Sequence, residues 1–285
     1  MTAAIEVQGL HKRYGDFEAI RGIDMSVAVG EVFGLLGPNG AGKTTTVEIL
    51  EGYRQRSGGE VSVLGHDPAR RELALRRRIG IVLQAGGIYS QLTPREALRH
   101  WAGFYPAPRQ VEEVLALVGL QEKADVRVRK LSGGQLRRLD FALALVGDPE
   151  LIFLDEPTTG FDPQARQVAW ETIRSLKALG KTILLTTHYL DEAQALADRV
   201  AIVKEGRILA IGPPRELDGH PPGAAHYRIG YRDASGRHVE IETEDPTRTL
   251  HELTAEALAR GEQLDELSVG RPSLEDVYLE LTADA

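Results

Sequence analysis

Short apolar runs alternate along the chain with longer segments in which hydrophobic residues recur at helical spacing. The runs are rich in Val, Ile and Leu, and they predict strands at residues 32–36, 79–83, 151–154 and 182–186. Because each run is almost continuously apolar, we expect strands that are covered on both faces. Two further runs, 200–203 and 207–210, flank Lys204-Glu205-Gly206 and predict a hairpin with Gly206 at positive φ. The pattern predicts an α/β fold with a largely parallel sheet.

The pattern changes near residue 212, where Gly212-Pro213-Pro214 and the Gly- and Pro-rich stretch 219–223 indicate a domain boundary. Beyond the boundary, the hydrophobic pattern predicts two exposed strands and a helix, at residues 227–231, 238–243 and 246–260. We therefore expect a first domain over residues 1–215 and a small α+β domain over residues 216–285.

The charge and the composition narrow the possible functions. The formal net charge is -8, and a chain this acidic is a poor binder of nucleic acid, because phosphate contacts need clustered Lys and Arg. The chain has no cysteine, which excludes a disulfide framework and thiolate metal sites. It begins without a secretory signal, and no apolar stretch approaches the roughly 20 residues that cross a bilayer. We expect a soluble protein that acts at a membrane only through a partner.

A glycine-rich segment follows the predicted strand 32–36 and precedes a helical pattern that begins at Thr45. Residues 37–44 match the phosphate-binding loop G-x-x-x-x-G-K-[ST] in every fixed position. In such a loop, consecutive backbone N–H groups turn toward phosphate, and the helix N-terminus adds positive potential. Lys43 would reach the β- and γ-phosphates of ATP, and the Thr44 hydroxyl would ligate Mg2+. The predicted ATP site comprises Gly37, Pro38, Asn39, Gly40, Ala41, Gly42, Lys43, Thr44 and Thr45.

Two acidic residues, Asp155 and Glu156, follow the apolar run 151–154. Ligands of open α/β sheets bind at the carboxyl ends of the strands, where this pair is expected to lie. Asp155 would hold Mg2+ through water, and Glu156 would be the base that polarises the attacking water. Two acids after a strand are usually no more than a solvated strand end. The phosphate-binding loop in the same chain favours the catalytic interpretation.

Leu131-Ser132-Gly133-Gly134-Gln135 precedes a helical pattern at 136–146, with Ser132 in a suitable place to cap the helix. Alone, such a segment is usually a flexible turn. Here the phosphate-binding loop, this segment and the acidic strand follow one another in the order seen in ATP-binding cassette (ABC) proteins. The chain resembles that family over about residues 5 to 212. The resemblance implies a P-loop NTPase cassette with a mixed, largely parallel sheet and a helical subdomain at about 86–147, which hydrolyses ATP to drive transport.

The resemblance also assigns roles to single residues. Gln84 is similar to the family glutamine that contacts Mg2+ and water, and His188 to the histidine that contacts the γ-phosphate. Tyr14 looks like the aromatic residue that stacks on adenine, and Asp162 like the aspartate that connects two nucleotide sites. Many members have Leu immediately before that aspartate, whereas this chain has Phe161, which keeps the bulk and the apolar character.

In the family, the segment that corresponds to residues 131–135 is called the signature segment, and that of one subunit completes the phosphate site of another. The residues that would act in trans are therefore Ser132, Gly133, Gly134 and Gln135. The chain has one phosphate-binding loop and one signature segment, which implies two copies or one copy with a homologue. Because every catalytic residue is present, a head-to-tail homodimer is favoured. The resemblance further implies an integral-membrane permease as partner, and a cytoplasmic protein held on the inner face of the cell membrane.

The end of the chain resembles one group within the family. Residues 271–282 closely resemble the C-terminal motif of ATPases that serve bacterial export permeases, including daunorubicin-type exporters, and residues 51–54 and 154–164 are also similar to that group. The resemblance implies an ABC-2 type exporter of drugs, lipids or polysaccharides, in which residues 216–285 contact the neighbouring ATPase. A capped amphipathic helix, opened at residues 273–276, would explain the local form of the motif equally well.

Six hydrophobic residues near Gln84 in the sequence suit either an interface with the permease or core packing: Ile88, Tyr89, Leu92, Trp101, Phe104 and Tyr105. Two other functions stay open at this point. A cassette ATPase that acts on ribosomes or DNA usually carries tandem cassettes or long coiled-coil insertions, and this chain has neither. A nucleotide-binding regulator without turnover would not need Glu156 and His188.

Overall fold

The computed structural model describes residues 3–82, 87–214, 217, 227–233, 235–270, 274 and 278. The chain divides into two compact units, Met1–Ile211 and Gly212–Ala285. The sequence pattern placed this boundary after residue 215 rather than after Ile211. In the described residues, no helix combines the length and the apolar character that are required to cross a bilayer.

The first unit is built on a six-stranded sheet in the order β5-β6-β7-β3-β8-β9. Its strands are β3 (Val32–Leu36), β5 (Ile79–Val82), β6 (Leu151–Asp155), β7 (Thr182–Thr187), β8 (Arg199–Lys204) and β9 (Arg207–Gly212). The pairings of β5 with β6, β6 with β7, β7 with β3 and β3 with β8 are all parallel. The turn between β8 and β9 has positive φ at Glu205 as well as at Gly206. The predicted α/β class and the predicted strands are confirmed.

A second, antiparallel sheet of three strands was not predicted from the sequence. It has the order β2-β1-β4 and contains β1 (Ala3–Tyr14), β2 (Phe17–Ala28) and β4 (Gly58–Val63). The pairing of β1 with β2 shifts register at several places, and Gly9 and Gly22 have positive φ. These irregularities break the apolar and polar alternation by which an exposed strand is recognised.

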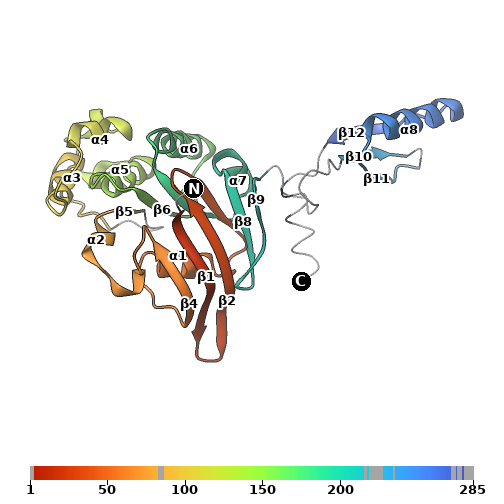
Figure 1. The fold of residues 1–285 in the computed structure, drawn as a ribbon. Coiled ribbons are helices and arrows are strands. Elements are labelled where there is room, and N and C mark those ends of the chain that lie inside the picture. Colours follow the sequence, from red (N-terminus) through yellow and green to blue (C-terminus); the bar gives the residue numbers. More distant parts are fainter. Residues whose placement is uncertain are drawn as a thin grey trace. The chain divides into compact units, whose positions relative to one another are not determined.

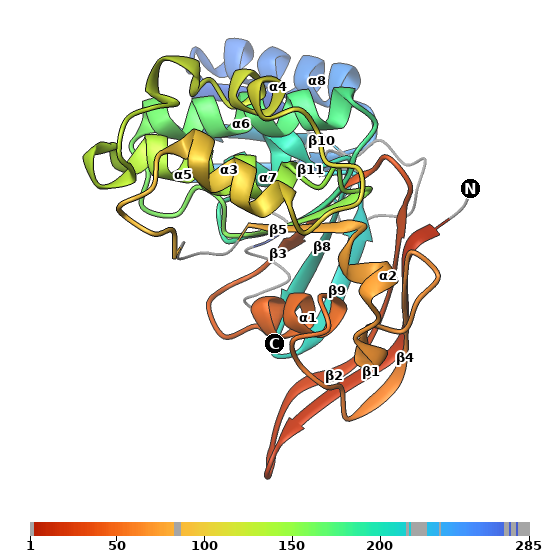
Figure 2. The same cartoon turned by 90° about the vertical axis from the view of Figure 1, so that its left-hand side faces the viewer.

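The six-stranded sheet separates two hydrophobic cores, because successive residues of each strand point to opposite faces. On one face, Leu151 and Phe153 of β6 pack with the antiparallel sheet and with α1 (Lys43–Leu50). On the other face, Ile152 and Leu154 pack with the helices that follow β5 and β6. Figures 1 and 2 show this arrangement within the first unit, with α3 to α6 on one side of the sheet and α1 with the antiparallel strands on the other.

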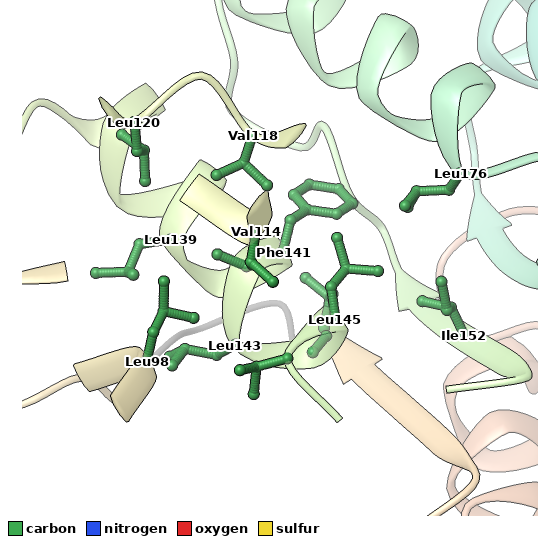
Figure 3. Close-up of a cluster of buried hydrophobic side chains, with 14 of the residues drawn as sticks. Leu98, Val114, Val118, Leu120, Leu139, Phe141, Leu143, Leu145, Ile152 and Leu176 are labelled. Carbon is green, nitrogen blue, oxygen red and sulfur yellow. The ribbon is translucent and has the colours of Figure 1, made fainter. Parts of the chain in front are cut away.

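The helical face has α5 at its centre (Figure 3). The helices of the first unit that follow α1 are α2 (Leu73–Arg76), α3 (Pro94–Ala102), α4 (Val111–Leu117), α5 (Gly133–Leu145), α6 (Pro163–Ala178) and α7 (Leu190–Leu196), with short 3-10 turns η1 (Pro68–Arg70), η2 (Gln121–Lys123) and η3 (Val128–Lys130). Leu139, Phe141 and Leu145 of α5 pack in one cluster with Leu98 of α3 and Val114 of α4. This packing fixes the start of α5 relative to the sheet.

The second unit contains a three-stranded antiparallel sheet in the order β11-β10-β12. Its elements are β10 (Tyr227–Arg232), β11 (His238–Thr243), α8 (Pro246–Arg260) and β12 (Asp265–Gly270). The predicted strands and helix of the small α+β domain are therefore found, and β12 is an addition. The tail motif at 271–282 lies outside the described residues, except for Leu274 and Tyr278.

Candidate nucleotide-binding site

The predicted phosphate-binding loop joins β3 to α1, as the motif requires. Three of its glycines have no room for a side chain or need positive φ. A Cβ on Gly37 would lie 2.2 Å from the carbonyl oxygen of Val203, and one on Gly42 would lie 2.8 Å from that of Ala19. Gly40 and Gly42 have φ of 83° and 103°. Only glycine gives this backbone path, which leaves the loop free to turn its N–H groups toward an anion.

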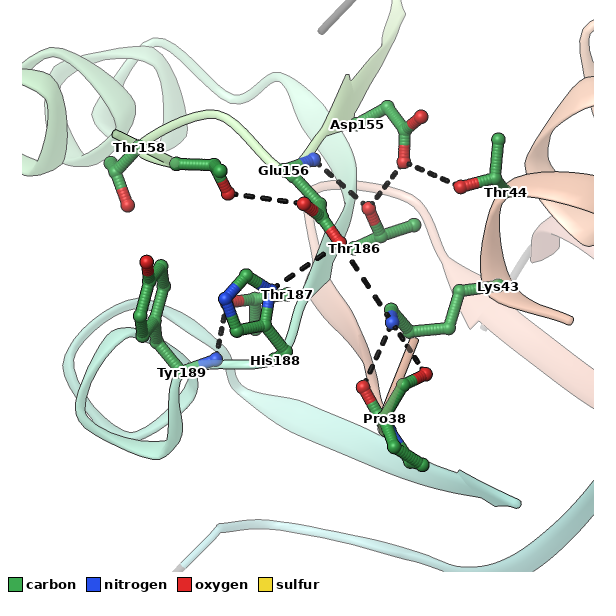
Figure 4. A network of polar contacts seen from close by, with 12 residues as sticks. Pro38, Lys43, Thr44, Asp155, Glu156, Thr158, Thr186, Thr187, His188 and Tyr189 are labelled. Atoms are coloured by element: carbon green, nitrogen blue, oxygen red, sulfur yellow. Dashed lines mark hydrogen bonds and ion pairs between the residues drawn. The ribbon is translucent and has the colours of Figure 1, made fainter. Parts of the chain in front are cut away.

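Lys43, the first residue of α1, is 4% exposed. Its ammonium donates to the carbonyl oxygens of Gly37 at 2.8 Å and Pro38 at 3.1 Å, and lies 3.9 Å from Glu156 Oε1 (Figure 4). Burial lowers the pKa of Lys43, and the charges of Glu156 and Asp155 oppose this shift. Among the described residues, this buried ammonium is held by carbonyl oxygens and by one carboxylate beyond hydrogen-bond distance, so it is suited to take phosphate oxygens in their place.

The acidic pair stands at the end of β6, beside the end of β7. Asp155 Oδ1 accepts a hydrogen bond from the Thr186 hydroxyl at 2.6 Å and one from the Thr44 hydroxyl at 3.4 Å. Carboxylate and hydroxyl oxygens are ligands that Mg2+ prefers, so Thr44 and Asp155 fit the predicted metal position. The structure thus brings together two of the three predicted metal ligands. The third, Gln84, lies outside the described residues.

Glu156 has a left-handed backbone, with φ of 44°, and its N–H donates to the Thr186 hydroxyl at 2.9 Å. Its side chain is 12% exposed. The carboxylate lies 3.4 Å from His188 Nδ1 and accepts from the Thr159 hydroxyl at 3.1 Å (Figure 4). A non-glycine residue in this backbone region is strained, and such strain often occurs at functional sites. The strained turn directs the carboxylate toward both Lys43 and His188.

His188 follows the last residue of β7, as predicted, and the neighbouring backbone fixes its place. The N–H of Tyr189 donates to the Thr187 hydroxyl at 2.9 Å, and the carbonyl oxygen of Thr187 accepts from the N–H of Gly37 at 3.3 Å. The turn that carries His188 is therefore tied to the phosphate-binding loop. The rings of His188 and Tyr189 lie 4.1 Å apart between their centroids.

Thr186, Thr187 and Thr159 are site residues that the sequence analysis missed. The two consecutive threonines after the apolar run of β7 carried a usable signal, because polar residues at the carboxyl end of a parallel strand lie at the ligand edge of the sheet. Thr159 carried no such signal, since it lies in the turn after Glu156.

Tyr14 lies at the end of β1 and is 40% exposed. The Lys12 ammonium is 4.9 Å and the Arg54 guanidinium 5.3 Å from the centre of its ring. An exposed ring between two cations can stack on a base, and its contact with adenine stays a prediction.

The signature segment caps α5. The Ser132 hydroxyl accepts from the N–H of Gln135 at 3.3 Å, and the Gln135 side chain accepts from the N–H of Ser132 at 3.0 Å. Ser132, Gly133 and Gly134 line a cavity of about 550 Å³ together with Phe161 and Asp162. Asp162 in turn caps α6, with Oδ1 accepting from the N–H of Ala165 at 2.8 Å. Among the described residues that line this cavity, none belongs to the phosphate-binding loop.

The six hydrophobic residues near Gln84 in the sequence divide into two groups by their exposure. Ile88, Leu92, Trp101 and Tyr105 are partly buried and pack against the helical core. Tyr89 and Phe104 are 68% and 62% exposed, respectively. The first group is explained by core packing, and the second is free to contact a partner.

The fold and the phosphate-binding loop together define a P-loop nucleoside triphosphatase. Comparisons with known proteins agree. Residues 20–159 match the model of the ABC transporter family. Nod factor export ATP-binding protein I of Burkholderia orbicola (strain AU 1054) is 41% identical, over 99% of this chain and 97% of its own. Daunorubicin resistance ATP-binding protein DrrA3 of Streptomyces coeruleorubidus is 38% identical, over 99% of this chain and 96% of its own.

A solved structure of the ATP-binding subunit of an ABC transporter has a TM-score of 0.71 at 25% identity, and the match covers 98% of this chain and 99% of that one. The chain therefore belongs to the ABC transporter family, as a subunit that binds and hydrolyses ATP to drive transport. Both of these relatives are named for export or drug resistance, in agreement with the resemblance to exporter ATPases found in the sequence.

Replacement of Lys43 by Ala should weaken ATP binding by about 10-fold or more, because hydrogen bonds from a charged group contribute roughly 1.5–3 kcal/mol. Isothermal titration with Mg2+ and ATP measures the effect. Lys177→Ala is the control, because Lys177 lies on α6 and pairs with Asp198. Equal ATP affinity of the Lys43→Ala variant and the wild type would contradict the role of the loop.

Replacement of Glu156 by Gln should lower kcat for ATP hydrolysis by about 100-fold or more, the contribution expected of a positioned general base. ATP binding should persist, since the amide keeps the size of the carboxylate. Phosphate release and nucleotide affinity are measured on the same preparation, with Glu113→Gln on α4 as the control. A variant that turns over at the wild-type rate would remove Glu156 from the catalytic role.

Proposed function

We propose that two copies of this chain bind two ATP molecules between them, head to tail, and that closure of the dimer drives a separate membrane permease. One observation carries the proposal. The phosphate-binding loop, Glu156 and His188 form one site, whereas the signature segment lines a different cavity of the same chain. A signature segment that does not face its own phosphate-binding loop is available to the loop of another copy.

The signature cavity has the chemistry for a phosphate. Ser132 and Gly133 are exposed, and α5 is a helix of 13 residues whose N-terminus they form. Free N–H groups and the helix dipole attract negative charge at such an end. Outside the adjoining residues and the helix backbone, no heavy atom lies within 4 Å of a Cβ built on Gly133, and the nearest to one on Gly134 is 4.0 Å away. A phosphate of the partner's nucleotide can therefore approach closely.

Within one site, each side chain has a distinct task. Lys43 and the backbone N–H groups of residues 39–42 would bind the β- and γ-phosphates. Thr44, Asp155 and Gln84 would hold Mg2+, which neutralises phosphate charge when bound. Glu156 would take a proton from the attacking water, and His188, 3.4 Å from it, would hold the γ-phosphate in line. Tyr14 would stack on adenine, and Asp162 would connect the two sites across the dimer.

The partner assignments follow from the family. A chain of this family works with a permease, so we infer that it sits on the cytoplasmic face of the cell membrane through that partner. Exposed Tyr89 and Phe104 support a contact there, since aromatic residues are enriched at interfaces. The second unit would contact the neighbouring ATPase. From the names of the relatives, we infer that the cargo belongs to the drug, lipid or polysaccharide class.

A mixture of two inactive variants tests the dimer. Lys43→Ala destroys the phosphate-binding loop, and Ser132→Arg blocks the signature cavity, so each variant alone should be inactive. A mixed dimer would keep one intact loop facing one intact signature segment, and ATPase activity should return on mixing. Mixtures that stay inactive, although two differently tagged variants co-purify as mixed dimers, would contradict a loop and a signature segment that act across the dimer.

Purification from native membranes tests the permease. The tagged protein is extracted in detergent, and the accompanying proteins are identified by mass spectrometry. We expect a multi-spanning permease and a higher ATPase rate in the complex than in the isolated protein. Recovery with ribosomes or another soluble partner instead would keep the ATPase chemistry but overturn the permease as its partner.

A further inference from the structure

The turn that carries Glu156 is held by a buried network of hydrogen bonds behind the nucleotide site. Glu156 has a strained backbone, with φ of 44°, and such strain persists only where the surrounding structure holds it. The two residues that follow, Pro157 and Thr158, each make a hydrogen bond to a helix that is distant in the sequence. These bonds keep the turn in its strained form.

Thr158 is tied to α7. Its side chain is fully buried and points away from the carboxylate of Glu156 (Figure 4). The Thr158 hydroxyl donates to Glu192 Oε1 at 2.7 Å. Glu192 lies on α7, four residues after His188. The bond therefore joins the turn of the candidate base to the helix that follows His188.

Glu192 is a fully buried acid whose carboxyl group lies outside the nucleotide site. The oxygen that accepts from Thr158 also accepts from the indole N–H of Trp170 on α6, at 3.1 Å. Burial raises the pKa of Glu192, and hydrogen bonds from Thr187, Thr158 and Trp170 oppose the shift. An apolar residue of similar size would fill this place without the desolvation cost of a carboxyl group. Packing alone therefore does not explain an acid here.

Pro157 is tied to α5. The Nε of Arg137, a residue that is 7% exposed, donates to the carbonyl oxygen of Pro157 at 3.2 Å. Arg137 lies five residues after Ser132, on the helix that the signature segment opens. The turn after Glu156 is thus held between two helices, by its main chain at Pro157 and by its side chain at Thr158.

We propose that Glu192 and Thr158 are positioning residues for ATP hydrolysis, because their hydrogen bond holds the turn that directs the Glu156 carboxylate at the attacking water. Both side chains are fully buried, so they act through Glu156 rather than on the nucleotide. The inference rests on the proposed role of Glu156 as the base and deepens it. Without the bond, the turn can relax and move the carboxylate, and a displacement of about 1 Å can lower a rate about 100-fold.

Variants of Thr158 test the bond directly. Thr158→Val keeps the shape of the side chain and removes the hydroxyl, whereas Thr158→Ser keeps the hydroxyl. Thr158→Val should lower kcat about 10-fold or more and leave the KM for ATP unchanged, because Glu156 acts in the chemical step and not in binding. Thr158→Ser should restore most of the lost kcat.

Trp170→Phe is the matched control, because it removes the other hydrogen bond to the same buried oxygen of Glu192. Each of Trp170→Phe and Thr158→Val takes one donor from that oxygen, so both should lower the thermal midpoint by similar amounts. The kcat of Trp170→Phe should stay within about 2-fold of the wild type, since its bond does not involve the turn after Glu156. A purely structural network would not separate the two variants.

Two replacements of Glu192 complete the test. Glu192→Gln keeps an oxygen that can accept from Thr158 and should keep most of kcat, whereas Glu192→Leu should be about as slow as Thr158→Val. The double variant Thr158→Val/Glu192→Leu should be no slower than either single one, since all three lose the same bond, and a double-mutant cycle on kcat measures this coupling.

The outcomes separate this inference from the proposed function. Equal kcat of Thr158→Val and Trp170→Phe, at an equal loss of stability, would overturn the positioning role while leaving Glu156 as the base. A Glu156→Gln variant that hydrolyses ATP at the wild-type rate would remove the base itself, and the positioning role with it.

Discussion

The parallel register of β3, β6 and β7 is the constraint on which the nucleotide site depends, because it brings the carboxyl ends of three strands to one edge. The Thr186 hydroxyl of β7 shows how closely the strands are tied there. It donates to Asp155 and accepts from the N–H of Glu156, both at the end of β6. One hydroxyl therefore positions both the carboxylate of the predicted metal ligand Asp155 and the strained turn at Glu156, the candidate base.

The two faces of the six-stranded sheet support different parts of the ATP-binding machinery. One core holds α1 and the antiparallel strands, and so supports the phosphate-binding loop and Tyr14. The other core holds α5, and so supports the signature segment. Because both cores include residues of β3, β6 and β7, the same sheet connects the phosphate-binding loop to the signature segment.

The sequence predicted the parts whose pattern is local. The apolar runs, the loop 37–44 and the cap at Ser132 are each contained in a few residues, and each was found where predicted. The strands β1, β2 and β4 were missed because register shifts and positive-φ glycines disturb their alternation. Thr186 was missed for a different reason, since its role is defined by Asp155 and Glu156, which lie far away in the chain and which no local pattern reports.

Helix α1 begins at Lys43, and the residue that follows its end is Glu51. Its eight residues span about 12 Å, a length over which a helix bends little. A ligand at the loop and a ligand at the opposite end of α1 would therefore act on the same helix. Thermodynamic linkage makes such an influence reciprocal: a ligand at the far end of α1 that strengthens ATP binding is itself bound more tightly by the same factor when ATP is present.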